Sequence, residues 1–221
     1  RSERFGVAQV HSPPDFLVFA TLPLRLVGVP VILDLHEAMP EFFRMRFPRV
    51  RNPLAHRLLR LQERLSIGFA STTITVTDAM RDRLVALGHR ADGIRVVINS
   101  PSLARFDATA HAPRAFREDG RLRLVYTGAL TPTYELDVTL RAVAAVQARR
   151  PDLDVTVDLY GRGDSEAPLR QLAEELGIAD RVQFHGRIPI EAVPAVLAGA
   201  DIGLAPTRLD RFTALTVSGK V

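Results

Sequence analysis

The chain has 221 residues, of which 47% are apolar and 24% charged, a balance typical of a globular protein with a sizeable buried core. It contains no cysteine, which excludes disulfide bonds and thiolate metal sites and fits a reducing compartment such as the cytoplasm. The formal net charge is +4, and Lys220 is the sole lysine, so arginine supplies all the other strongly basic side chains.

The beginning of the chain resembles neither a natural start nor a signal peptide. It opens at Arg1 without an initiator methionine or a signal-type cleavage site, and we expect a sequence that is cut there. The most apolar stretch, residues 16–35, contains Pro23, Arg25 and Pro30 and changes its period midway. This pattern predicts a buried helix followed by a buried strand, not a membrane-spanning helix.

Short apolar runs rich in β-branched residues recur along the whole chain, and segments of helical period separate most of them. Strands that are apolar throughout and alternate with helices indicate parallel sheets covered on both faces, an α/β architecture. The predicted strands are residues 6–10, 31–35, 72–76, 96–98, 122–126, 155–160, 182–184 and 202–204.

The helical pattern is clearest between the later strands. We expect Asp78 to cap the start of one helix, and Gly88 and Gly177 to follow the ends of two helices. Apolar residues recur at helical spacings of three and four, at Leu136, Leu140, Val143 and Val146 and again at Leu169, Leu172 and Leu176.

The periodic pattern lapses before residue 120, which divides the chain into two lobes. We expect a first Rossmann-like lobe over residues 1–104, a linker over 105–120 and a second Rossmann-like lobe over 121–221. Open α/β sheets bind ligands at the carboxyl edges of their strands. The functional site is therefore expected in a cleft between the two edges.

Four segments together resemble the retaining GT-B glycosyltransferases of family 4, the glycosyl transferases group 1. Members of that family begin with further βα units and continue into a Phe-Glu-Tyr-like helix, so the resemblance implies two incomplete lobes here. The matching segments are residues 10–16 with 31–41, 72–80 with 96–101, 125–130 with 136–137, and 159–221, which opens on Leu159-Tyr160-Gly161-Arg162-Gly163 and ends on Lys220-Val221.

The resemblance implies a function as well as a fold. It predicts transfer of a sugar from a nucleotide-sugar donor to a hydroxyl group of a polysaccharide or lipid-linked glycan, with retention and without a metal or other cofactor. The second lobe would hold the donor, and no nucleic-acid partner is expected. The 221-residue fragment alone is expected to be inactive.

Two residues match positions that contact the donor in this family. His36 follows the carboxyl end of a strand and matches the active-site histidine, which implies contact with the donor sugar and its phosphate. Lys220 matches the cation that reaches the donor phosphates. The alternatives are a loop histidine satisfied by its neighbours and an ordinary surface lysine.

Glycines follow two strands of the second lobe, where a helix N-terminus favours an anion. Gly128 and the run Gly161, Arg162 and Gly163 match loops that border the nucleotide in the family, although tight turns would also explain the glycines. Asp210 lies near where relatives carry an acid that faces the donor sugar.

The segment 128–135 departs from the family pattern. Relatives usually place a cation there, followed by a glycine, whereas this chain has Ala129, Thr133, Tyr134 and Glu135. Losing such a cation would lower the rate on the order of 10²-fold, unless Arg162 or Lys220 replaces it. Two alternatives therefore stay open, a non-catalytic GT-B-like scaffold that binds a sugar or nucleotide, and a sugar-nucleotide epimerase.

The pair Asp152 and Asp154 imitates the metal-binding Asp-x-Asp of another glycosyltransferase fold. It precedes its predicted strand and so lies at the amino edge, away from the expected cleft. We saw no other cluster of histidines and carboxylates at ligand spacing along the chain and expect no metal site.

The stretch from Arg44 to Arg64 contains seven arginines and one acid, Glu63. Leucines supply an apolar face, so a basic amphipathic helix is predicted that could lie on anionic lipid. A solvated outer helix is the alternative. With the lipid-linked acceptors of the family, this pattern favours a cytoplasmic protein held weakly at the inner face of the membrane. The leucines of this face are Leu54, Leu58, Leu59, Leu61 and Leu65.

Overall fold

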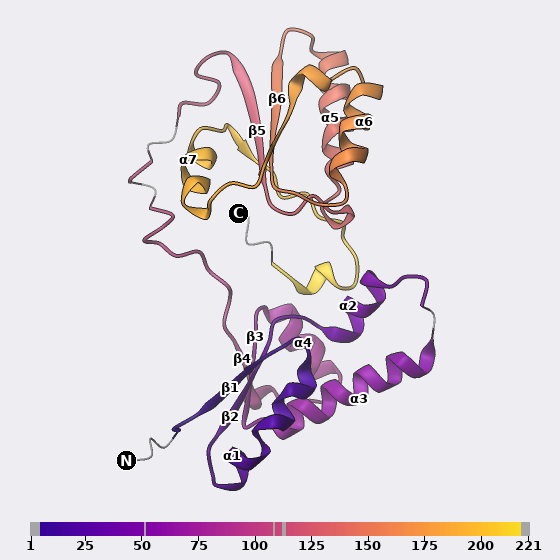
Figure 1. Ribbon diagram of the computed structural model, residues 1–221, viewed down its shortest axis with the longest axis vertical. Helices are drawn as coiled ribbons and strands as arrows, with labels where there is room; N and C mark the ends of the chain where they lie inside the picture. Colours follow the sequence, from indigo (N-terminus) through magenta and orange to yellow (C-terminus); the bar gives the residue numbers. More distant parts are fainter. Residues whose placement is uncertain (1–4, 51, 108, 112–113, 218–221) are drawn as a thin grey trace. The chain divides into compact units, whose positions relative to one another are not determined.

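The computed structural model describes residues 5–50, 52–107, 109–111 and 114–217, and these form two compact units (Figure 1). The first unit holds the chain up to Asn99 together with Leu209–Val217, and the second holds Ser100–Arg208. Each contains a four-stranded parallel sheet, which confirms the predicted α/β class with two Rossmann-like units. Leu209–Val217, which we assigned to the second lobe from the sequence, packs with the first unit.

The sheet of the first unit has the strand order β1-β2-β3-β4. The last strand forms two residues earlier than predicted, because Ile94 is buried whereas Val97 and Ile98 are more than half exposed. The strands are β1 (Ala8–His11), β2 (Val31–Leu35), β3 (Thr72–Thr75) and β4 (Ile94–Val96).

Helices follow each of the first three strands of this unit. Thr77, not Asp78 as predicted, caps α4, because its Oγ1 accepts a hydrogen bond from the Met80 amide at 3.0 Å. The same hydroxyl donates to the Leu215 carbonyl at 2.7 Å and so ties Leu209–Val217 to this unit. The helices are η1 (Asp15–Thr21), α1 (Leu22–Leu26), α2 (Met39–Arg46), α3 (Pro53–Phe69), α4 (Asp78–Ala86), η2 (Ala91–Gly93) and η6 (Thr213–Leu215).

The helical segment before β2 is mostly exposed, so the prediction of a buried helix there is wrong. Val18 is fully buried, whereas most other apolar side chains of η1 and α1 are on the surface. The buried strand that we predicted to follow is present as β2. No helix among the described residues is both long enough and apolar enough to cross a membrane.

The sheet of the second unit has the order β7-β6-β5-β8. Figure 1 shows α5 and α6 on one side of the β5–β6 pair and α7 on the other, so helices cover both faces. The elements are β5 (Arg121–Thr127), η3 (Pro132–Tyr134), α5 (Leu136–Arg149), β6 (Asp154–Tyr160), α6 (Glu166–Glu175), η4 (Ala179–Arg181), β7 (Val182–Gly186), η5 (Ile190–Ala192), α7 (Val193–Ala198) and β8 (Ile202–Gly203).

A buried ion-pair network joins three helices of the first unit. Arg83 of α4 bonds Glu41 of α2 at 2.5 Å and Glu63 of α3 at 2.9 Å. All three side chains are less than 15% exposed. Removing one partner would leave a buried charge uncompensated, which makes the network a condition for packing these helices together.

Asp15, the first residue of η1, is a further buried acid beside this network and is 1% exposed. Burial and the negative charge of Glu63 raise the pKa of Asp15 to about 6, against the opposing influence of the Ser12 hydroxyl and the Arg83 guanidinium. The folded protein therefore keeps a proton on this carboxyl group at pH values where the unfolded chain has released it.

We expect the stability of the fold to fall as the pH rises from about 4 to about 6, because the folded-state pKa of Asp15 exceeds its unfolded value. Asp15→Asn is neutral at every pH, so it should match the wild type near pH 4 and exceed it by about 3 kcal/mol at pH 8. Urea unfolding at a series of pH values measures this difference. Carboxyl groups far from Asp15 titrate alike in both proteins, so equal pH slopes would contradict the prediction.

Candidate functional site

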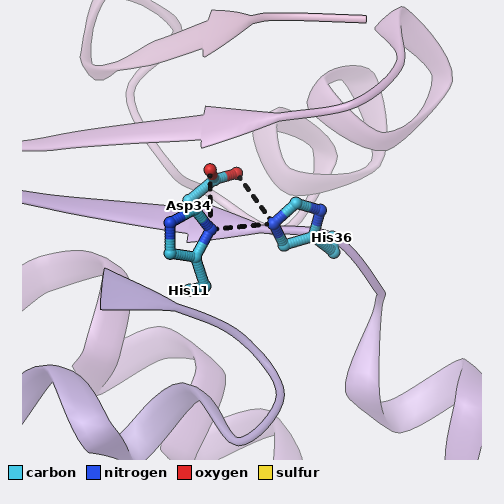
Figure 2. Close-up of side chains that lie close together, drawn as sticks. All are labelled: His11, Asp34 and His36. Atoms are coloured by element: carbon cyan, nitrogen blue, oxygen red, sulfur yellow. Dashed lines mark hydrogen bonds and ion pairs between the residues drawn. The ribbon is translucent and has the colours of Figure 1, made fainter. Parts of the chain in front are cut away.

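A polar cluster lies at the carboxyl edge of the first sheet, where side chains of two paired strands point to the same face. Gln9 and His11 point to one face of β1, and Asp34 and His36 point to one face of the segment through the end of β2, because side chains two residues apart share a face. The parallel register places His11 opposite Asp34. The four side chains therefore meet on one face. Figure 2 shows three of them, His11, Asp34 and His36.

The side chains of this cluster lie within hydrogen-bond or ion-pair distance of one another. His11 Nδ1 lies 3.0 Å from His36 Nε2 and 3.2 Å from Asp34 Oδ2. His36 Nε2 lies 3.6 Å from Asp34 Oδ1, and the two imidazole rings stack with centroids 5.4 Å apart. Gln9 Nε2 donates to Asp34 Oδ2 at 2.9 Å and holds the carboxylate in place.

Exposure increases across the cluster from the carboxylate outward. The Asp34 side chain is 12% exposed, that of His36 35% and that of His11 61%. The cluster thus has a buried negative end and an open imidazole end. Among the described residues, it is the only group of three side chains that could ligate a metal ion, with ligand atoms within 4.8 Å of one another.

His36 also lines a small hollow of about 230 Å³ in the first unit. Burial raises the pKa of the adjacent Glu37 carboxyl group, with the charge of His36 opposing the change. Because it lines this hollow, the His36 imidazole is accessible to a ligand at the carboxyl edge of the sheet, the position predicted from the sequence. The hollow is lined by His36, Glu37, Val76, Asn99, Thr216 and Val217.

In the second unit, the predicted glycines allow two backbone segments to approach closely. A Cβ at Gly161, where φ is +146°, would lie 1.7 Å from the Gly128 carbonyl oxygen, and a Cβ at Gly163 would lie 2.2 Å from that of Leu130. No larger residue fits either place without moving the backbone. The loops after β5 and β6 therefore depend on these glycines for their packing.

Backbone hydrogen bonds occupy several amides of these loops. The Gly128 amide donates to the Tyr160 carbonyl at 2.9 Å, and the Gly161 amide donates to the Gly186 carbonyl at 2.8 Å. These two N–H groups are engaged within the fold, which supports the tight-packing explanation of the glycines. An anion at this edge would have to be bound by other groups, which include side-chain cations.

Two arginines supply that positive charge. Arg162 and Arg187 line a hollow of about 260 Å³ at the carboxyl ends of β5 and β6. Among the described residues, neither guanidinium has a carboxylate within ion-pair distance. A hollow at this edge with two unneutralised cations suits an anionic ligand.

The loop that lacks the family cation receives an arginine from elsewhere in the chain. The Arg208 amide donates to the Thr133 carbonyl at 3.1 Å, and its guanidinium Nε bonds Glu135 Oε1 at 2.9 Å. Ala129 accepts a hydrogen bond from the Tyr126 hydroxyl through its carbonyl oxygen. A cation is thus present beside this loop, paired with Glu135.

The remaining predicted site residues lie elsewhere. Asp210 belongs to the first unit, and its Oδ1 accepts from the amides of Phe212 and Thr213 at 2.8 and 2.9 Å, so it caps the turn that leads into η6. Lys220 lies outside the described residues. Asp152 pairs with Arg150 and does not share a ligand group with Asp154.

Four residues of these two edges were missed from the sequence. His11 and Asp34 could have been found by noting that Gln9-x-His11 and Asp34-x-His36 alternate on neighbouring strands. Arg187 directly follows a strand-ending glycine, a weaker signal of the same kind. Arg208 carries no local signal, because its contact with Glu135 spans 73 residues of sequence.

Family models match both units. Residues 1–100 match the glycosyl transferase 4-like domain, and residues 121–219 match the glycosyl transferases group 1 model. A D-inositol 3-phosphate glycosyltransferase of Stackebrandtia nassauensis is 32% identical over 195 residues, which cover 83% of this chain and 38% of that protein. A 2-deoxystreptamine N-acetyl-D-glucosaminyltransferase of Streptomyces fradiae is 27% identical and covers 94% of this chain and 50% of its own.

Solved structures share the fold at low identity. HepE of Anabaena in complex with UDP matches with a TM-score of 0.66 at 19% identity, over 90% of this chain and 53% of that one. Sucrose-phosphate synthase of Thermosynechococcus elongatus matches with a TM-score of 0.64 at 16% identity, over 94% and 52%. The chain spans between 27% and 53% of the length of the curated relatives that it matches.

Proposed function

Because the chain belongs to the GT-B glycosyltransferases, with a 4-like domain followed by a group 1 domain, we propose that it serves in transferring a sugar from a nucleotide-sugar donor to an acceptor hydroxyl group. The acceptor is a polysaccharide or lipid-linked glycan, and transfer proceeds with retention and without a metal or other cofactor. The observation that carries the proposal is the arginine-lined hollow at the carboxyl edge of the group 1 domain.

The donor binds to the second unit in this proposal. A nucleoside diphosphate is strongly anionic, and guanidinium groups bind phosphate oxygens through paired hydrogen bonds. Arg162 and Arg187 present such groups in one hollow without carboxylate partners among the described residues. Arg208 is the candidate to replace the cation that relatives carry in the 128–135 loop, since it already reaches Thr133 and Glu135.

The first unit contributes His36, whose imidazole contacts the donor sugar and its phosphate. The hollow beside His36 and the partial exposure of its ring support this role. Stabilisation of the leaving diphosphate by fixed cations and hydrogen-bond donors is the largest catalytic effect expected in such a site. Lys220 is proposed as a further phosphate contact.

One observation favours a second candidate function. Ala129 and Glu135 stand where relatives carry a cation and a glycine, and the carboxylate of Glu135 neutralises the nearest arginine. A non-catalytic module that binds a nucleotide or sugar would tolerate these changes. Such a module binds nucleotide but releases no transfer product, whereas an epimerase interconverts donor sugars without consuming an acceptor.

We expect calorimetric titration of the chain with UDP, GDP and their sugars to detect binding to the second unit. Arg162→Ala and Arg187→Ala should each weaken nucleotide binding about tenfold, because each removes a charged contact to the diphosphate. Arg150→Ala is the matched control, since Arg150 is an exposed arginine paired with Asp152. The absence of nucleotide affinity in the wild-type chain would refute the transferase and the nucleotide-binding module together.

In the gene product that contains this chain, we expect His36→Ala to lower the rate of sugar transfer at least about 10²-fold, because the site loses a hydrogen-bond donor to the reacting group. Nucleotide binding to the second unit should be unchanged. Transfer is measured by product analysis with labelled donor. His89→Ala, which follows α4, is the control, and undiminished transfer by His36→Ala would remove His36 from the mechanism.

A second surface of the first unit supports weak contact with an anionic membrane, from which a location at the cytoplasmic face is proposed. Four leucines at spacings of four and three form an exposed stripe along α3, whereas Glu63 and Ser66 face inward. Arginines flank the stripe, a combination that favours anionic lipid. The stripe consists of Leu54, Leu58, Leu61 and Leu65, each at least half exposed.

We expect the chain to cosediment with phosphatidylglycerol vesicles more strongly than with phosphatidylcholine vesicles, and less so as salt is raised. The double variant Leu58→Ser and Leu61→Ser should reduce this binding several-fold by shrinking the apolar stripe. Leu103→Ser is the control because Leu103 is 81% exposed but lies in the second unit. Equal sedimentation of all three proteins would contradict the membrane role of α3.

A further inference from the structure

Three side chains at the ends of β1 and β2 bring their ligand atoms together at spacings close to those of a tetrahedral coordination site. His11 Nδ1 lies 3.0 Å from His36 Nε2 and 3.2 Å from Asp34 Oδ2, and His36 Nε2 lies 3.6 Å from the other carboxylate oxygen, Asp34 Oδ1. Zinc bound to nitrogen or oxygen at its usual distance of about 2.0–2.1 Å separates adjacent ligands by about 3.3–3.4 Å. Each of the three spacings is within a few tenths of an ångström of this value, and a rotation of the Asp34 carboxylate would present one oxygen to both nitrogens.

The two imidazole nitrogens and the carboxylate compete for the same hydrogen bonds. With both imidazoles neutral, a proton on His11 Nδ1 can be directed at either His36 Nε2 or Asp34, but not fully at both. A cation among the three atoms accepts a lone pair from each of them. The arrangement thus suits a metal ion better than a hydrogen-bonded trio.

The surroundings support a ligand set of this kind. Gln9 Nε2 bonds the Asp34 carboxylate from the same face, an outer contact of the type that orients metal-bound carboxylates. Adjacent parallel strands hold His11 and Asp34 in register. The exposed His11 ring leaves the outer side of the site open to a fourth ligand such as water.

We propose that His11, Asp34 and His36 bind one divalent transition-metal ion, with Zn²⁺ as the preferred occupant. Two imidazoles and one carboxylate favour zinc and its neighbours over magnesium or calcium, which prefer oxygen ligands alone. Three protein ligands with an open position are the arrangement of zinc sites that keep a fourth place for water or another ligand, not of closed structural sites.

Occupancy of this site regulates the proposed transfer reaction, an inference that rests on the function proposed above for His36. The metal binds Nε2 of His36, the atom that faces His11 and Asp34, and draws the imidazole ring towards Asp34. His36 Nε2 then has no lone pair or proton left for the donor sugar. Zinc is therefore an inhibitor of transfer, and a chelator restores the activity.

Calorimetric titration of the chelator-treated 221-residue chain with Zn²⁺ tests the site directly. We expect a stoichiometry of one ion per chain and at least a tenfold loss of affinity in each of His11→Ala, Asp34→Asn and His36→Gln. His185→Ala is the matched control, because His185 pairs with the single carboxylate of Asp158 in the second unit and has no third ligand among the described residues.

Two further measurements guard against misfolded variants and adventitious binding. Circular dichroism reports whether each variant is folded, and Co²⁺ substituted for zinc should give the intense visible absorption of tetrahedral coordination in the wild type and in His185→Ala, but not in the three ligand variants. Absence of zinc binding, or equal affinity in the wild type and the three ligand variants, would overturn the proposal.

The nucleotide titration separates this inference from the proposed function. It reports on the second unit and is run with a chelator present. Nucleotide binding without zinc binding would remove only the metal site. Zinc binding without nucleotide affinity would keep the metal site and remove both the transferase and the inhibition of transfer.

Discussion

Parallel pairing of β1 with β2 is the constraint on which the first unit depends. It aligns the carboxyl ends of the two strands and sets His11 opposite Asp34. The pleat then brings Gln9 and His36 to the same face. A slip of one strand by one residue would turn its two side chains to the opposite face, away from the two on the other strand, and break the cluster. The chemistry at this edge is therefore a consequence of backbone hydrogen bonding far more than of any local motif.

Elements that are buried on both sides were predictable from the sequence. Strands such as β2 and β6 are apolar or β-branched through most of their length, because helices cover both faces of their sheets. The position of His36 at a strand end was predictable for the same reason. In contrast, the segment before β2 has the composition of a buried helix but lies mostly on the surface. Its composition does not specify whether other elements of the fold pack against it.

Contacts between distant segments set the limit of prediction at the site. The Arg208–Glu135 pair joins positions 73 residues apart, and the capping bonds of Asp210 use a carboxylate that the family pattern would have aimed at a sugar. The His11 and Asp34 contacts required the strand register as well as the strands. The spacing of apolar residues cannot predict these contacts, because it describes one helix or strand at a time.

The close approach of Gly161 to the Gly128 carbonyl has a consequence for how such a protein diversifies. The backbone of this rim tolerates no added carbon atom at Gly161, so substitutions that keep its shape are confined to the neighbouring side chains. Arg162 and Arg187 project from that fixed frame into the same hollow. Ligand preference is therefore open to change by exchanging single side chains, without rebuilding the loops that present them.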